Sequence, residues 1–79
     1  MYEFQMILIN EFGEFFGQKI KLNEEKCDLL IDMSKTFYMN SGFELTCEDG
    51  SFMVFAPDVV KNSILKINRI SIKIEEENV

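Results

Sequence analysis

Residues 43–56 read FELTCEDGSFMVFA and carry the strongest structural signal in this chain. Apolar residues recur at alternate positions on both sides of Asp49-Gly50, as they do in half-buried strands. Asp-Gly is a preferred pair for a two-residue β-hairpin turn of type I′. The pattern therefore predicts a hairpin made of strands over about 43–48 and 51–56.

A two-residue turn also determines which side chains of the hairpin share a face. It places Cys47 opposite Phe52 and Leu45 opposite Val54, so that one face is apolar throughout. On this register Met53 and the other odd-numbered residues of the second strand point to the opposite face.

That opposite face combines apolar and acidic side chains. It would carry Met53 and Phe55 beside Glu44, Thr46 and Glu48. Exposed aromatic and Met side chains with acidic neighbours are typical of a protein-contact patch. We therefore predict that this face binds a partner.

Further strands and a helix are expected on either side of the hairpin. Alternation at period two predicts strands over about 2–10, 18–22 and 64–75. Asn23 is a preferred N-cap and is followed by two glutamates, which a helix N-terminus favours. Apolar residues at helical spacing then predict one long helix over about 24–40.

Glycine and proline mark the expected connections. Two glycines within 11–18 predict a turn or loop between the first two strands, and Gly42 predicts the C-terminal cap of the long helix. Pro57 is favoured at the first position of a helix and predicts a short helical turn over about 57–62.

Together these elements predict an α+β fold. The expected architecture is a small, mostly antiparallel sheet of four to five strands with the long helix on one face. The last strand should be bulged or turned at Asn68-Arg69, and a competing interpretation extends the short helix to residue 67. The 79 residues suffice for one domain, 1–79, whose acidic end, 76–79, we expect to be frayed.

Composition argues against several classes of function. The chain has 14 acidic and 8 basic residues, a net charge of −6, no His and a single Arg, Arg69. A small nucleic-acid binder is usually basic, and His is the commonest general acid–base side chain. We therefore expect no direct nucleic-acid binding, no enzymatic activity and no catalytic or cofactor-binding residues.

The two cysteines, Cys27 and Cys47, are expected to be small, buried and unreactive apolar groups. Two Cys without His cannot complete a zinc site unless carboxylates or a second subunit supply the other ligands, so no metal site is predicted. The N-terminus lacks the features of a signal peptide, and the apolar runs are too short to span a membrane. These observations favour a cytoplasmic protein, and the excess of Ile and Lys over Ala and Arg suggests a bacterial or phage source.

The function that fits these features is a small acidic protein-binding module that occupies a partner's surface, as an inhibitor, immunity-type protein or adaptor does. The partner would be a protein, for which a basic surface would suit the acidic rim. One alternative is a self-associating structural subunit, and a lower one is a nucleic-acid mimic that blocks a basic groove. The predicted contact residues are Met53, Phe55, Glu44, Glu48, Phe12, Phe15 and Phe16.

Overall fold

The structure is a computed structural model that describes residues 1–39 and 41–72. Within them the chain is α+β, as predicted. The elements follow in the order β1 (Tyr2–Asn10), β2 (Gly13–Phe16), β3 (Ile20–Leu22), α1 (Glu24–Ser34), the 3₁₀-helix η1 (Phe37–Met39), β4 (Phe43–Thr46), β5 (Phe52–Phe55), α2 (Pro57–Lys61) and β6 (Ile64–Ser71).

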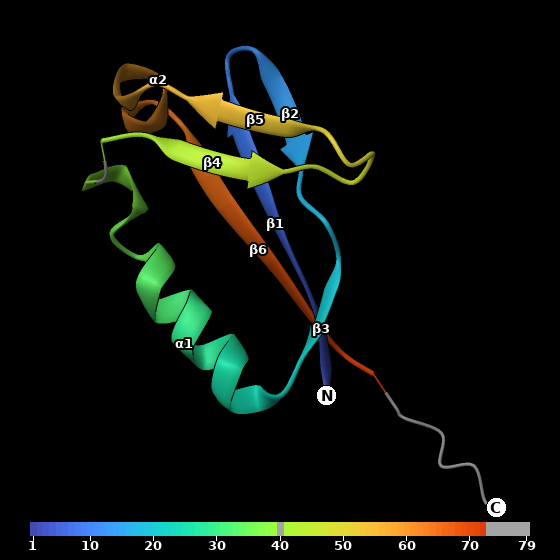
Figure 1. Ribbon diagram of the computed structural model, residues 1–79. Coiled ribbons are helices and arrows are strands. Elements are labelled where there is room, and N and C mark those ends of the chain that lie inside the picture. The colour runs from blue at the N-terminus through green and yellow to red at the C-terminus, as the bar shows by residue number, and fades with distance from the viewer. Residues whose placement is uncertain (40, 73–79) are drawn as a thin grey trace, which may run out of the picture.

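Strand β1 is the centre of a four-stranded antiparallel sheet (Figure 1). One of its edges pairs with β3 along Tyr2–Phe4 and with β2 along its last four residues. Its other edge pairs with β6 without interruption from Tyr2 to Ile9. The strands β4 and β5 form a separate two-stranded sheet.

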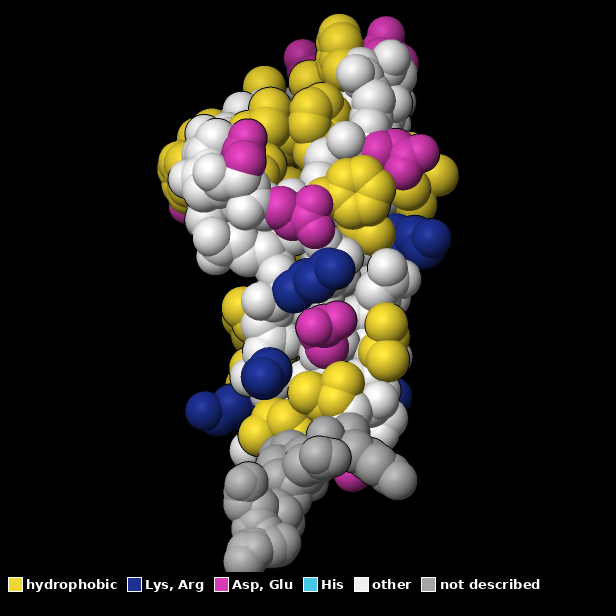
Figure 2. Space-filling view, turned by 90° about the vertical axis from the view of Figure 1, so that its right-hand side faces the viewer, with side chains coloured by type: hydrophobic (Ala, Val, Ile, Leu, Met, Phe, Trp, Pro, Cys, Tyr) yellow, Lys and Arg dark blue, Asp and Glu magenta, His cyan; other side chains and the backbone are white. Residues whose placement is uncertain are grey.

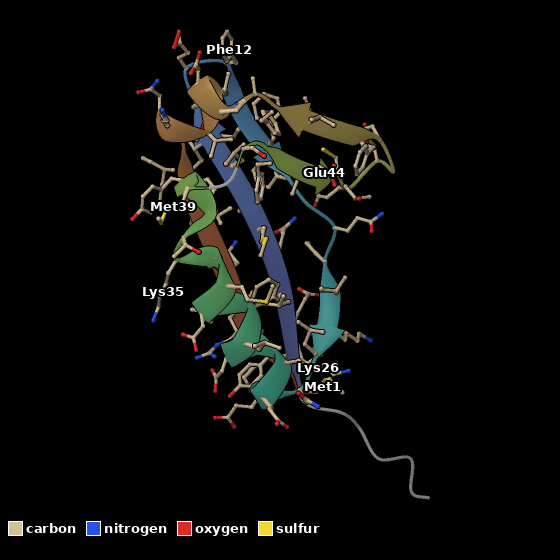
Figure 3. The ribbon with its side chains drawn as sticks, turned by 60° about the vertical axis from the view of Figure 1, so that its left-hand side comes forward. Met1, Phe12, Lys26, Lys35, Met39 and Glu44 are labelled. Atoms are coloured by element: carbon tan, nitrogen blue, oxygen red, sulfur yellow. The ribbon has the colours of Figure 1, made fainter. Side chains whose placement is uncertain are left out.

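Helix α1 and the β4–β5 hairpin lie on the same side of the large sheet (Figures 1 and 3). The core lies beneath the hairpin, where Leu8 of β1 and Val60 of α2 are completely buried. Cys27 is also completely buried on the inner side of α1, and Asp28 reaches Arg69 of β6. Helix and hairpin thus cover different parts of one sheet face.

The connection between β1 and β2 is shorter than the loop that the two glycines predicted. The chain turns at residues 11–12 and returns at once as β2, with Asn10 opposite Gly13. The Asn10 side chain accepts a hydrogen bond from the Phe12 N–H at 2.8 Å, and Gly13 has a φ of 134°. The prediction of a loop over 11–18 was therefore wrong for its middle part, and the predicted strand 18–22 is reduced to β3.

Helix α1 begins as predicted and ends early. Asn23 caps it by accepting a hydrogen bond from the Lys26 N–H at 2.8 Å. The last α-helical residue is Ser34, not a residue near 40. The hydroxyl of Ser34 donates to the carbonyl of Ile31, and that of Thr36 donates to Met33, so side chains compete for the helix carbonyls where it ends. Gly42 is therefore not its cap.

The last strand is confirmed, but not its predicted bulge. Pro57 opens the short helix α2, and the chain is already a strand at Ile64, so the interpretation that continued the helix to residue 67 was wrong. Asn68 and Arg69 pair in register with Gln5 and Phe4, so the strand has no bulge there. Residues 73–75 of the predicted strand and the predicted frayed tail, 76–79, lie outside the described residues.

Candidate protein-contact surface

The β4–β5 hairpin is shifted by one residue from its predicted register. Leu45 lies opposite Met53, and Phe43 lies opposite Phe55. The predicted partners of these two residues were Val54 and Ala56. Because successive side chains of a strand point to opposite faces, a shift of one residue exchanges the two faces of β5.

The cause of the shift is a three-residue loop over 48–50. The Gly50 N–H donates to the Cys47 carbonyl at 2.9 Å, and Cys47 in turn donates to the Ser51 carbonyl at 2.8 Å. Gly50 has a φ of 89°, whereas no other residue of the described loop has a positive φ, as a type I′ turn would require of Asp49. A type I turn followed by a glycine of this kind is the common three-residue alternative.

Asp49 stabilises this loop through its side chain. Its carboxylate accepts hydrogen bonds from the Ser51 N–H at 2.9 Å and from the Ser51 hydroxyl at 2.6 Å. The hydroxyl bond, followed by the N–H bond, lowers the pKa of the Asp49 carboxyl below its usual range. An Asp that can bond the residue two positions later is the sequence signal that could have favoured the longer loop.

The shift reverses the expected exposure of the aromatic residues. Phe55 is only 7% exposed and belongs to the core, and Met53 is half-buried against it. Phe52 and Val54 are 59% and 67% exposed. The prediction that Met53 and Phe55 face solvent was therefore wrong, and the exposed apolar residues of this hairpin are the two that sequence reasoning placed inside.

We call the solvent-facing side of the hairpin the outer hairpin face and define it as Glu44, Thr46, Phe52 and Val54. Val54 lies opposite Glu44, and Phe52 lies opposite Thr46. All four side chains are exposed. Glu44, marked in Figure 3, thus keeps its predicted place beside exposed apolar groups, although its neighbours differ from those predicted.

The hairpin is attached to the large sheet through the segment that joins β2 to β3. Gln18 donates its N–H to the Thr46 carbonyl, and Glu48 donates its N–H to the Phe16 carbonyl, each at 3.0 Å. Gly17 lies between the two layers, where a Cβ atom would come within 2.9 Å of the Met6 carbonyl oxygen. This close approach requires glycine and holds the outer hairpin face in a defined position.

A buried amide adds a second attachment. Gln5 is 6% exposed, and its Nε2 donates to the Gly17 carbonyl at 2.8 Å and to the Glu48 carboxylate at 3.0 Å. Glu48 was predicted only as a contact residue. Its side chain also fastens the hairpin loop to β1, a role that the sequence did not indicate.

A groove of about 300 Å³ adjoins the outer hairpin face. It lies between α1, β3 and β4 with Phe4 and Met6 of β1 in its lining, which is mainly apolar. Glu44 and Thr46 belong both to this groove and to the outer hairpin face, so the two form one continuous surface. The groove is lined by Phe4, Met6, Gly17, Gln18, Ile20, Leu30, Glu44, Leu45 and Thr46.

The three aromatic residues predicted near the first turn do not form one patch. Phe15 is half-buried, and its ring contacts that of Phe55 edge-on, with 5.2 Å between centroids. Phe16 pairs with Ile7 and lies on the opposite face of the sheet, where it is 40% exposed. Phe12 is 69% exposed at the β1–β2 turn, at the end of the molecule (Figure 3).

Charge is distributed unevenly over the molecule. In the face shown in Figure 2, most acidic side chains lie in the upper half and the basic side chains lie in the middle and below, whereas hydrophobic side chains occur in both halves. Two acids of α1 are paired, Asp28 with Arg69 at 2.9 Å and Asp32 with Lys35 at 3.2 Å. The hairpin acids Glu44 and Asp49 form no ion pair within the described residues.

The described part of the chain contains no group of three or more His, Cys, Asp or Glu residues placed to hold a metal ion. In the same residues, every buried side-chain nitrogen and oxygen has a hydrogen-bond partner. None of the described helices is long and apolar enough to cross a membrane.

Comparison of this chain with protein-family models, with curated proteins and with solved structures finds no match.

Proposed function

We propose that this chain is a small acidic protein-binding module that acts by occupying a surface of a partner protein, as an inhibitor, immunity-type protein or adaptor does. The observation that carries the proposal is the exposure of Phe52 and Val54 on a hairpin that backbone hydrogen bonds attach to the large sheet. Burying each of these side chains in an interface would contribute about 1.5–3 kcal/mol before the costs of association.

The shape of the surface supports an interface with an apolar centre. Phe52 and Val54 provide an exposed ridge, and the adjacent groove can receive an apolar side chain of the partner. Interfaces commonly combine such buried anchors with a polar rim that excludes water. The proposed module would bind without chemistry of its own.

The charges around this surface favour a basic partner. Glu44 lies beside Val54, and Glu48 and Asp49 lie at the hairpin tip. With a net charge of −6, the chain would attract a basic protein at long range and raise the association rate at low salt. The pairing of Asp28 and Asp32 with basic residues gives no support to the nucleic-acid mimic.

A cytoplasmic site of action forms part of this proposal. Cys27 and Cys47 are both free and buried, which suits a compartment that keeps thiols reduced.

Capture of partners from cell extract tests the proposed function. The wild-type chain is compared with a Phe52→Ser, Val54→Ser variant, which should remain folded because both side chains are exposed. A matched control, Leu29→Ser with Met33→Ser, removes two comparably exposed apolar side chains from α1. We expect the hairpin variant to lose a partner that the wild type and the helix variant retain. Equal capture by all three folded proteins would contradict the proposal.

A further inference from the structure

Strand β6 leaves one edge of the sheet open. It pairs with β1 over its whole length, and no other described strand pairs with it. Its eight residues, Ile64–Ser71, contain no proline and no bulge, two of the devices that commonly protect an edge, and carry two charged side chains, Lys66 and Arg69. The unpaired edge is thus long, regular and able to accept another strand.

The hydrogen-bond pattern shows which backbone groups are free. Ile72 donates its N–H to the Met1 carbonyl at 3.1 Å, so the even-numbered residues of β6 direct their backbone groups toward β1. In an antiparallel ladder these groups alternate along the strand. The backbone groups of Leu65, Ile67, Arg69 and Ser71 therefore point away from β1.

We propose that this chain forms a symmetric dimer in which the free edge of β6 pairs antiparallel with the same edge of a second copy, about a two-fold axis at Ile67. In an antiparallel pair, residues with outward-directed backbone groups lie opposite residues of the same kind in the other strand. Because these are the odd-numbered residues of β6 in both copies, the two-fold axis must pass through a residue and not between two residues. An axis at Lys66 or Arg69 would place two like charges opposite each other, and like charges directly opposite destabilise a sheet.

The side chains fit the axis at Ile67. Ile64 of one copy lies opposite Ile70 of the second copy, and Ile70 lies opposite the second Ile64. These two side chains are 65% and 56% exposed in the single chain. Lys66 lies opposite Asn68 and Arg69 lies opposite Leu65, so no like charges are directly opposed. An axis at Asn68 would instead place Lys66 opposite Ile70. The Ile67 axis therefore covers two exposed apolar side chains of each chain at once.

The dimer would extend the sheet from four to eight strands and leave the outer hairpin face free. The hairpin is attached through the segment that joins β2 to β3. Both of these strands pair with the edge of β1 that does not pair with β6. Self-association and partner binding would therefore use separate surfaces, and each can be tested without the other.

Sedimentation equilibrium of the full chain measures the assembly state. We expect a species of twice the 9.3 kDa chain mass. Ile64→Lys combined with Ile70→Lys should weaken dimerisation on the order of tenfold, because it replaces two apolar pairs with like charges. Ile64→Glu combined with Ile70→Lys places opposite charges together and should retain the dimer. A monomeric wild type, or equal loss in both folded variants, would overturn the proposal.

Cross-linking tests the register itself. Residues 66 and 68 would form a non-hydrogen-bonded pair across the axis, with Cα atoms about 4.5 Å apart, a distance that a disulfide can bridge. Lys66→Cys combined with Asn68→Cys should give a covalent dimer under mild oxidation, and Lys66→Cys alone should give at least about tenfold less. Equal yields, or no cross-link in the double variant, would contradict an axis at Ile67.

Discussion

Leu45 lies directly opposite Met53 in the β4–β5 hairpin, and this pairing determines which apolar side chains a partner can reach. It turns Met53 and Phe55 to the core and leaves Phe52 and Val54 in solvent. Had Leu45 paired with Val54, the two sets would have exchanged places. The proposed contact surface therefore depends on the length of a single loop.

The two phenylalanines of β5 should differ strongly in their effect on stability. Phe55→Ala removes a buried ring that contacts Phe15, and we expect it to lower the free energy of unfolding by about 3 kcal/mol or more. Phe52→Ala should change it by less than about 0.5 kcal/mol, because that ring is exposed. Urea unfolding of both variants measures the difference. Similar losses would mean that the register described here is wrong.

Gly50 should tolerate only residues that adopt a positive φ. Its φ of 89° disfavours a β-branched side chain, so Gly50→Val should destabilise the fold by about 1–2 kcal/mol. Gly50→Asn provides the control, since Asn adopts left-handed conformations more readily, and it should cost less. Thermal unfolding compares the two. An unchanged stability of the valine variant would refute the loop geometry.

The Asp49 carboxyl should report on the same loop. Its pKa lies below the usual range chiefly because the Ser51 hydroxyl bonds to the ionised form, and Ser51→Ala should therefore raise that pKa. Since the folded-state pKa is lowered, the interaction stabilises the fold above the unfolded-state pKa. It is lost as the pH falls through the folded-state pKa. NMR titration of Asp49 measures the shift, and a pKa unchanged by the substitution would be inconsistent with this bond.

The hairpin shows how far sequence reasoning reaches here. The existence of both strands followed from alternation, and their boundaries were correct to within two residues. The register did not follow, because Asp-Gly is compatible with a two-residue or a three-residue loop and both faces of β5 are apolar. The bond that closes the longer loop, from the Gly50 N–H to the Cys47 carbonyl, is visible only in the structure. The bond from Ser51 to Asp49 is the part that the sequence could have suggested.

Elements that neighbouring residues determine were predicted better than those that depend on tertiary contacts. The start of α1 at Asn23 and the helix at Pro57 depend on local chemistry and were predicted correctly. The place of Gln5 could not be predicted, because its partners, Gly17 and Glu48, are brought to it by tertiary structure. The outer hairpin face was not predicted either, because it depends on which face of β5 packs against the core in the tertiary structure.

Both native thiols should react slowly. Cys27 is completely buried and Cys47 is 9% exposed, so a thiol reagent can reach them only when the structure opens. We expect slow modification of the native protein and rapid modification of both thiols in denaturant. The rate is followed by mass spectrometry. Rapid labelling of either residue in the native state would contradict its burial.

A partner that covers the outer hairpin face should be captured by site-specific photo-cross-linking from that face. A photoreactive phenylalanine analogue is placed at Phe52 or, in a second protein, at Phe12, which is also exposed but lies at the β1–β2 turn. Each protein is irradiated in cell extract, and the products are compared. We expect a covalent adduct with a different protein from position 52 and at most a weak one from position 12. An adduct from position 12 with none from position 52 would contradict it.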